Sequence, residues 1–160
     1  MSEFRVGQGF DLHPFAKNRT LILGGVEIPK EEGLAGHSDA DALSHAICDA
    51  LLGALALGDM GKFFPDTDPQ FRGKSSLYFL ETVRKFIEKE GWMISNVDST
   101  IVTEKPMLKP HIDSMRNRIA KTLQIETNQI SVKATRPERL GALGRQEGLL
   151  ALATILIRKA

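Results

Sequence analysis

An Asp-x-His pair near the start of the chain and a histidine on a following helix are residue types that bind a divalent metal ion. Asp11 and His13 lie two residues apart on a predicted strand, so their side chains point to the same face of that strand. His45 lies on a predicted helix, in a stripe with Asp41 and Asp49 at four-residue spacing. Asp11, His13 and His45 together form a ligand set of the kind found in catalytic zinc sites, which leave the fourth position open.

Each pattern also has an ordinary structural interpretation. The Asp-x-His pair alone is typical of a polar strand end. The helical stripe places Asp41, His45 and Asp49 on one side of the helix, where all three face the same neighbour or solvent. Only the combination of strand pair and helical histidine favours a metal ion, and three ligands without a fourth Cys or His favour chemistry over structural bracing.

Two further segments have residues that suit an anion. His37, in "AGHSDAD", comes immediately before the predicted helix, where backbone N–H groups and the helix dipole attract negative charge. Residues 133 to 148 concentrate Lys133, Arg136, Arg139 and Arg145, which is typical of a strand end that faces phosphate. Either segment taken alone is also compatible with a solvated loop.

A Gly-x-Gly pair precedes the Asp-x-His pair. Gly7 and Gly9 lack the third glycine and the following helix of a dinucleotide-binding fingerprint, so we reject a Rossmann interpretation. We expect these glycines to allow close packing of the backbone instead.

The bulk composition limits the partners and the compartment. With 21 Lys and Arg against 20 Asp and Glu, the net charge of +1 gives no electrostatic footprint for nucleic acid. The single cysteine, Cys48, excludes an intramolecular disulfide and is predicted to be a small buried apolar residue. "MSEFRVGQ" lacks the features of a secretory signal, and "LLALATILI" is too short to span a bilayer. We therefore expect a cytoplasmic protein that binds neither nucleic acid nor membrane.

The hydrophobic periodicity predicts strands interleaved with about three helices. Ser38 is the expected N-cap of the first helix, with Asp41 in a capping-box position, and Gly58 follows its last turn. The Pro, Gly and Asp content of residues 59–73 disfavours any regular element there. The expected elements are strands at 4–13, 96–104, 130–135 and 149–157, a hairpin around Gly24 and Gly25, and helices at 38–55, 76–90 and after Pro110.

This order of elements indicates an α/β or α+β sandwich of two layers. The segment at 149–157 is ambiguous between strand and helix by periodicity alone. No repeat or linker-like composition divides the chain, so we expect one domain over residues 1–160.

Four segments carry a resemblance to a known family. They are "GxGxDxHPF" at 7–15, "GHSDADALSHAICDALLGALALGDMGKFFPDTDP" at 36–69, "NVDSTI" at 96–101 and "VKAT..E.LG..GR.EG" at 132–148. The chain resembles the 2-C-methyl-D-erythritol 2,4-cyclodiphosphate synthases over nearly its whole length. The resemblance implies an α+β two-layer sandwich like that of Bacillus chorismate mutase, in which a mixed four- to five-stranded sheet carries about three helices on one face. It also implies a homotrimer with active sites between adjacent subunits.

The resemblance further implies an enzyme, a phosphorus-oxygen lyase of non-mevalonate isoprenoid biosynthesis. It converts 4-diphosphocytidyl-2-C-methyl-D-erythritol 2-phosphate to the 2,4-cyclodiphosphate and releases CMP, by attack of the 2-phosphate on the β-phosphate. Zn²⁺, or another divalent transition metal, is implied at Asp11, His13 and His45. Mg²⁺ or Mn²⁺ is implied at Glu138, together with substrate phosphates.

The same resemblance implies the residues that meet the substrate. His37, Arg136 and Glu138 are the implied catalytic residues, and His37 and Ser38 match a segment that contacts the attacking phosphate. Two groups of residues are expected to contact the substrate, and within the second group the resemblance implies a cytidine pocket at residues 103–109, Ala134 and Thr135. The first group is Asp11, His13, His37, Ser38, Asp59, Met60, Gly61, Phe64, Pro65, Asp66, Thr67 and Asp68, and the second is Thr103, Lys105, Pro106, Met107, Leu108, Lys109, Ala134, Thr135, Arg136, Glu138 and Arg145.

Three positions depart from the family pattern. Arg136 stands where a second Thr usually follows "KAT", Met107 follows the proline of the cytidine loop, and Ala142 replaces an aromatic residue that often lines the trimer's channel. Arg136 is the best sequence argument for a rival hypothesis, a trimeric metabolite-binding or regulatory module without catalysis. A second rival is a zinc hydrolase of phosphate esters, for which Asp49 is the candidate general base.

Overall fold

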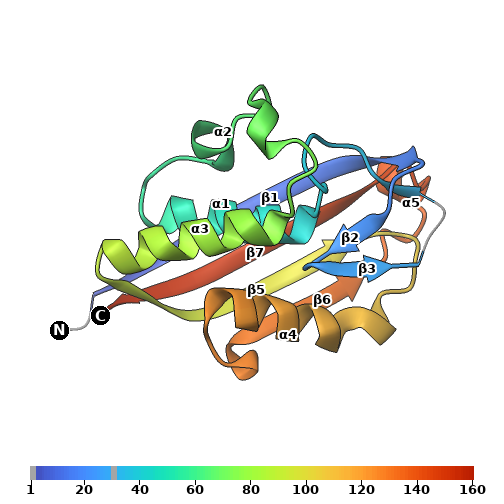
Figure 1. Cartoon of the computed structure of the whole chain (residues 1–160). Coiled ribbons are helices and arrows are strands. Elements are labelled where there is room, and N and C mark those ends of the chain that lie inside the picture. Colours follow the sequence, from blue (N-terminus) through green and yellow to red (C-terminus); the bar gives the residue numbers. More distant parts are fainter. Residues whose placement is uncertain (1–2, 30–31) are drawn as a thin grey trace.

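The protein forms two layers, a sheet and a set of helices that cover one face of it (Figure 1). The structure is a computed structural model and describes residues 3–29 and 32–160. Its main sheet has the strand order β4-β1-β7-β5-β6. The strands are β1 (Phe4–Lys17), β4 (Glu32–Leu34), β5 (Trp92–Val102), β6 (Ile130–Thr135) and β7 (Gly148–Lys159), and a separate hairpin joins β2 (Leu21–Leu23) to β3 (Val26–Ile28). The predicted mixed sheet of an α+β protein is confirmed.

The centre of the sheet is a long antiparallel ladder between β1 and β7. Its register runs from Phe4 opposite Arg158 to Pro14 opposite Gly148. On its other side β7 pairs antiparallel with β5, which pairs parallel with β6. Because β7 lies between two partners and under the helices, its near-continuous apolar run is that of a buried strand, which resolves the ambiguity in the sequence.

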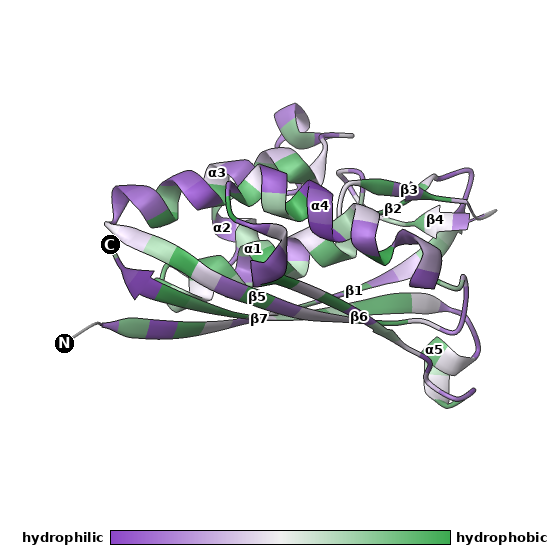
Figure 2. Cartoon of the chain, turned by 90° about the horizontal axis from the view of Figure 1, so that it is seen from below, coloured by the Kyte–Doolittle hydropathy of each residue, from purple (hydrophilic) through white to green (hydrophobic). Residues whose placement is uncertain are grey.

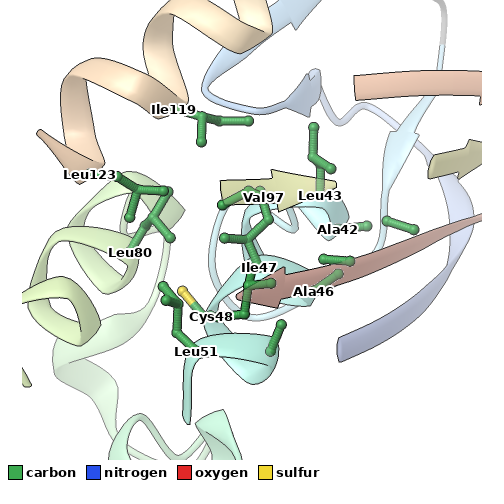
Figure 3. Packing of buried hydrophobic residues seen from close by; sticks show 14 of the residues in the cluster. Ala42, Leu43, Ala46, Ile47, Cys48, Leu51, Leu80, Val97, Ile119 and Leu123 are labelled. Atoms are coloured by element: carbon green, nitrogen blue, oxygen red, sulfur yellow. The ribbon is translucent and has the colours of Figure 1, made fainter. Parts of the chain in front are cut away.

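Three long helices, α1 (Ala42–Ala54), α3 (Ser76–Lys89) and α4 (Ile112–Leu123), form the second layer. Figure 2 shows them on one side of the sheet. Their inner faces and the sheet enclose a core that includes Leu51, Leu80, Ile119 and Val97 (Figure 3). Cys48 is fully buried among them, as predicted. Among the described residues, no helix is both long and apolar enough to cross a membrane.

The opposite face of the sheet has no layer over it in Figure 2. On this face β1 alternates outward-pointing apolar side chains with residues that face the helices. Phe4, Val6, Phe10 and Leu12 are each more than half exposed, at 55%, 66%, 59% and 54%. Gln8 lies between Val6 and Phe10 on this face, but four large apolar side chains so close together are still unusual on a surface that stays in water.

The helix-facing side of β1 carries Gly7 and Gly9, directly under α1. A Cβ at Gly7 would lie 1.8 Å from the carbonyl oxygen of Ala50, and one at Gly9 would lie 1.9 Å from that of Ala46. Only glycine leaves room for helix and strand backbones to approach this closely. The predicted packing role of the Gly-x-Gly pair is confirmed.

The predicted start of the first helix is wrong. Helix α1 begins at Ala42, and its N-cap is Asp41, whose carboxylate accepts a hydrogen bond from the Ser44 amide at 3.0 Å. Ser38 cannot cap this helix because Ala40, which lies between Ser38 and the helix start, has a left-handed backbone with φ of 56°. A helix cannot continue through that conformation. The Ser38 hydroxyl instead accepts a hydrogen bond from the Ala40 amide, so the expected capping box is absent.

The prediction that residues 59–73 hold no regular element is also wrong. They contain the short helix α2 (Met60–Phe63) and the 3-10 helix η1 (Pro69–Phe71). Asp59 caps α2 through the Lys62 amide at 3.2 Å, and Asp68 caps η1 through the Gln70 amide at 3.0 Å. The aspartates that suggested a loop therefore begin two short helices.

Other short elements connect the layers. They are the 3-10 helices η2 (Lys109–His111) and η3 (Thr127–Gln129) and the four-residue helix α5 (Gly141–Gly144). Strand β5 begins at Trp92, before the expected start at residue 96.

Candidate metal centre

Three side chains from β1 and α1 meet at one point. Asp11 Oδ2 lies 2.9 Å from His13 Nε2 and 3.0 Å from His45 Nδ1. One ligand atom from each residue lies within 4.8 Å of the others, and all three residues are partly buried. The predicted convergence of this carboxylate and two imidazoles is confirmed, and Asp11, His13 and His45 form the only such group of three or more among the described residues.

Each imidazole is oriented by a bond on its other nitrogen. His13 Nδ1 lies 2.6 Å from the carbonyl oxygen of Ala35, so this nitrogen donates its proton and Nε2 is turned toward Asp11. His45 Nε2 lies 2.8 Å from the Ser76 hydroxyl, which leaves Nδ1 toward Asp11. Metal-binding histidines are typically held in this way, with the remote nitrogen bonded to a fixed partner. The arrangement fits a zinc ion.

The charges of the group also suit a cation. Burial alone would raise the pKa of Asp11, but hydrogen bonds from His13 and His45 and their charge lower it to about 2. The hydrogen bond to Asp11 raises the pKa of His13 above its ordinary value of 6.5, although burial opposes this shift. The same hydrogen bond therefore favours a proton on His13 Nε2, at the position where a metal ion would bind.

We expect zinc binding to weaken as the pH is lowered. The metal must displace the proton from His13, so affinity is complete above the raised pKa of His13 and is lost as the pH falls through it. Below that pKa the loss should be about tenfold or more per pH unit. Asp11 stays ionised at these pH values because its pKa is about 2. Competition with a chelator at several pH values measures the effect, and a constant affinity would contradict the assignment of His13 as a ligand.

The helical stripe does not face a single neighbour, and it is not a solvated face. Asp41 is fully buried and accepts hydrogen bonds from the Gly24 and Gly25 amides at 2.9 and 2.7 Å. Asp49 accepts one from the Met60 amide at 2.8 Å, at the start of α2. Of the stripe, only His45 joins the metal-ligand group. Asp41 therefore binds the β2–β3 hairpin, His45 belongs to the candidate metal site, and Asp49 binds the start of α2.

A cavity of about 280 Å³ opens above the metal-ligand group. This cavity brings together several of the predicted substrate contacts. They are the metal ligands Asp11 and His13, the pair His37 and Ser38, and Met60, Phe64 and Asp66 from the 59–68 segment. Asp59, Gly61, Pro65, Thr67 and Asp68 are not among the residues that line the cavity. The lining residues are Asp11, His13, Gly36, His37, Ser38, His45, Asp49, Met60, Phe64, Asp66, Phe71 and Phe79.

The predicted cytidine residues gather at a second cavity, of about 140 Å³, where β5 and β6 end side by side. Its lining shares no residue with the first cavity. Lys105 and Arg145 lie instead in a third cavity, of about 460 Å³, which Arg136 also lines. The residues around the second cavity are Thr103, Pro106, Met107, Leu108, Lys109, Ala134, Thr135 and Arg136.

Glu138 does not join the metal-ligand group. It is exposed on the turn between β6 and α5, and it and Arg139 have left-handed backbones, with φ of 53° and 62°. The Arg139 amide donates a hydrogen bond to Glu104 Oε2 at 3.1 Å, which holds this turn against the end of β5. No hydrogen bond or ion pair engages the Glu138 carboxylate within residues 3–29 and 32–160.

Two residues beside the candidate metal ligands, Asp39 and Ser76, have no distinctive signal in the sequence. Asp39 was visible only as part of "GHSDAD", and Ser76 only as a polar residue at the start of a helix. In the structure Ser76 contacts both Asp39 and His45. No spacing in the sequence connects a helix start with a histidine 31 residues earlier.

The fold and the site define a two-layer α+β protein in which three side chains that could hold a metal ion line one cavity. The YgbB family model matches residues 4–158, so the chain belongs to the YgbB family. It is 52% identical to the 2-C-methyl-D-erythritol 2,4-cyclodiphosphate synthase of Nostoc punctiforme over 159 residues, 99% of each chain. It is also 52% identical to the enzyme of that name from Bacillus velezensis, over 98% of this chain and 99% of the relative.

Solved structures show the same relationship. The bifunctional IspDF from Campylobacter jejuni is 39% identical with a TM-score of 0.96, and the match covers 100% of this chain and 43% of that longer one. The IspF–CDP complex from Plasmodium falciparum is 33% identical with a TM-score of 0.86, over 99% of this chain and 98% of that chain.

Proposed function

We propose that this protein, a lyase of non-mevalonate isoprenoid biosynthesis, converts 4-diphosphocytidyl-2-C-methyl-D-erythritol 2-phosphate to 2-C-methyl-D-erythritol 2,4-cyclodiphosphate and CMP. The observation that carries the proposal is the metal-ligand group of Asp11, His13 and His45 at the base of a cavity, in a chain of this family. An oxygen of the 2-phosphate bonds to the β-phosphorus. The bond from that phosphorus to the bridging oxygen breaks, and CMP leaves with the electron pair.

The reaction brings two anionic groups together. Two unit charges about 4 Å apart repel by roughly 4 kcal/mol at an effective dielectric constant near 20. When bound, zinc at Asp11, His13 and His45 would polarise the β-phosphate, and Mg²⁺ or Mn²⁺ at Glu138 would neutralise charge on the leaving group. The free, exposed carboxylate of Glu138 suits an ion that takes few protein ligands beside substrate phosphates.

The remaining cavity residues orient the substrate and exclude water. His37 donates a hydrogen bond to the Asp68 carbonyl at 3.2 Å, which ties the His-Ser segment to η1 over the cavity. We assign His37 and Ser38 to the attacking phosphate, and the Asp66 carboxylate to the hydroxyls of the methylerythritol. Phe64, Phe71 and Phe79 form an aromatic wall with centroids 4.7 to 5.6 Å apart. An apolar wall favours ring closure over hydrolysis because it keeps competing water away.

We propose that the protein acts as a homotrimer with active sites between subunits. The apolar row of Phe4, Val6, Phe10 and Leu12 on the open sheet face supports an association that buries it. The metal cavity and the cavity with the predicted cytidine residues share no lining residue. In a trimer, the metal cavity of one subunit would lie beside the cytidine cavity of its neighbour. The IspF–CDP complex supports a cytidine diphosphate-type ligand. The chorismate mutase-like arrangement, the single domain over residues 1–160 and the cytoplasmic location complete the proposal.

Incubation of the purified protein with the diphosphocytidyl substrate, Zn²⁺ and Mg²⁺ tests the proposal. We expect equal amounts of CMP and cyclic diphosphate. A linear hydrolysed product would favour the hydrolase hypothesis, with Asp49 as the base; burial raises the pKa of Asp49, and its carboxylate lines the metal cavity. Tight binding of substrate without turnover would favour the metabolite-binding module.

Glu138→Gln should spare zinc binding and lower turnover by two orders of magnitude or more, because loss of preorganised charge at a reacting phosphate typically costs about 10²- to 10³-fold. Zinc content and initial rates across a Mg²⁺ titration measure the two effects separately. Glu126→Gln, at the exposed start of η3, is the matched control. An unchanged Mg²⁺ dependence would count against the role of Glu138.

A further inference from the structure

Ser76 is a fully buried serine at the first position of α3, outside the lining of the metal cavity. Its amide donates a hydrogen bond to Asp39 Oδ2 at 2.9 Å, and its hydroxyl is bonded to Asp39 Oδ1. The same hydroxyl oxygen lies 2.8 Å from His45 Nε2. Asp39 therefore holds both polar groups of Ser76 and fixes the hydroxyl against the histidine.

The direction of these bonds follows from the number of protons. An ionised carboxylate can only accept hydrogen bonds, so Asp39 takes the single hydroxyl proton of Ser76. The serine oxygen is left as an acceptor, and it can bond His45 only if Nε2 carries a proton. In the structure Nδ1 is hydrogen-bonded to Asp11 Oδ2 at 3.0 Å. A metal ion bound by both residues would take the place of the proton on Nδ1, while the proton on Nε2 would stay bonded to the serine oxygen.

We propose that Asp39 and Ser76 are positioning residues for the metal centre, which hold His45 in the tautomer with the proton on Nε2 and the lone pair of Nδ1 toward the metal ion. The inference rests on the metal site of the proposed function. Neither residue lines the cavity, so both act through His45. Ser38 is a weaker partner, because its hydroxyl oxygen lies 3.3 Å from His45 Nε2, whereas that of Ser76 lies 2.8 Å away.

The hydrogen-bonded chain Asp39–Ser76–His45, called here the relay, also connects the metal site to a second helix. Ser76 begins α3, and Asp39 lies in the segment between β4 and α1. The Asp39 carboxylate also accepts a hydrogen bond from the Asp41 amide, at 3.2 Å. The orientation of His45 thus depends on the packing of α3 against the start of α1.

Zinc affinity of the purified full-length chain, measured without substrate by competition with a chelator, tests the proposal. We expect Ser76→Ala to weaken zinc binding by about 10- to 100-fold, the usual effect of losing an outer-shell partner of a metal ligand. Ser76→Thr keeps the hydroxyl and should recover most of the affinity. In Asp39→Asn the amide can donate to the Ser76 oxygen, which frees the hydroxyl proton for His45 Nε2 and favours the wrong tautomer. The ¹⁵N chemical shifts of His45 in the metal-free protein should report that change.

Ser75→Ala is the matched control. Ser75 is the exposed N-cap of α3 and accepts a hydrogen bond from the Leu77 amide at 3.4 Å, so this variant weakens the same helix start without touching the relay. The zinc affinity of Ser75→Ala should stay within about twofold of the parent, because this variant loses only the hydrogen bond that caps α3. Equal losses in Ser75→Ala and Ser76→Ala, or an unchanged affinity in Ser76→Ala, would overturn the inference. Absence of zinc binding in the unaltered protein would instead overturn the proposed metal site.

Discussion

Replacing His45 with alanine should abolish stoichiometric retention of zinc while the protein stays folded. His45 supplies one of three ligands, and the remaining Asp11 and His13 hold a divalent ion weakly. We expect a loss of affinity beyond the roughly 100-fold upper range of outer-shell changes. The fold should survive because alanine favours helix and the His45 side chain is at the edge of the core, 15% exposed. Metal analysis after dialysis and thermal unfolding measure the two effects.

His111→Ala is the control for this variant. His111 lies at the end of η2, and it is not part of the metal-ligand group. Its replacement should leave zinc content unchanged. Retention of stoichiometric zinc by the His45 variant would refute the ligand assignment and, with it, the proposed reaction.

Replacing Gly9 with alanine should destabilise the protein strongly and weaken zinc binding at the same time. The added Cβ would lie 1.9 Å from the carbonyl oxygen of Ala46 and 2.7 Å from the amide nitrogen of Ala50. Both are backbone atoms of α1 and cannot move aside alone, so β1 and α1 must separate. Overpacking typically costs about 1–3 kcal/mol, and a clash with helix backbone belongs at or above the top of that range. Asp11 and His45 lie on these two elements and would be drawn apart.

Gly53→Ala provides the comparison, since it adds the same methyl group to α1 where space exists. The nearest atom to a Cβ there is the Gln8 carbonyl oxygen at 3.7 Å. A glycine in a helix costs about 1 kcal/mol relative to alanine, so this variant should be as stable as the parent or more stable. Denaturant unfolding of both variants decides the matter, and a Gly9 variant of undiminished stability would show that strand and helix are not in tight contact.

The parts of the fold and site that follow from local periodicity could be predicted from the sequence. Alternation along β1 places Gly7, Gly9, Asp11 and His13 on one face, and helical spacing puts His45 on a side of α1 that can meet them. The order of strands and helices likewise predicted a sandwich of two layers, whereas the mixed sheet was implied only by the family resemblance. These features depend on regular repeats of backbone geometry, which the order of residue types records directly.

The parts that depend on individual hydrogen bonds could not be predicted. Asp41 and Ser38 are both good N-caps, and only the left-handed backbone of Ala40 decides between them. Asp59 and Asp68 suit a turn and a helix cap equally well, so the short helices of residues 59–73 were missed. The contact of Ser76 with His45 arises from the packing of α3 on α1, a tertiary relationship that no sequence period expresses.

The buried carboxylate of Asp41 links the β2–β3 hairpin, which is not part of the main sheet, to the start of α1. It accepts hydrogen bonds from Gly24 and Gly25 in the β2–β3 turn and from the amide and hydroxyl of Ser44 in the first turn of α1. Opening the hairpin would leave this charge without half of its donors in the interior, so the hairpin and the start of α1 should open in one cooperative step. The amide protons of Gly24 and Gly25 should then exchange with solvent as slowly as those of the helix, although they belong to a two-residue turn.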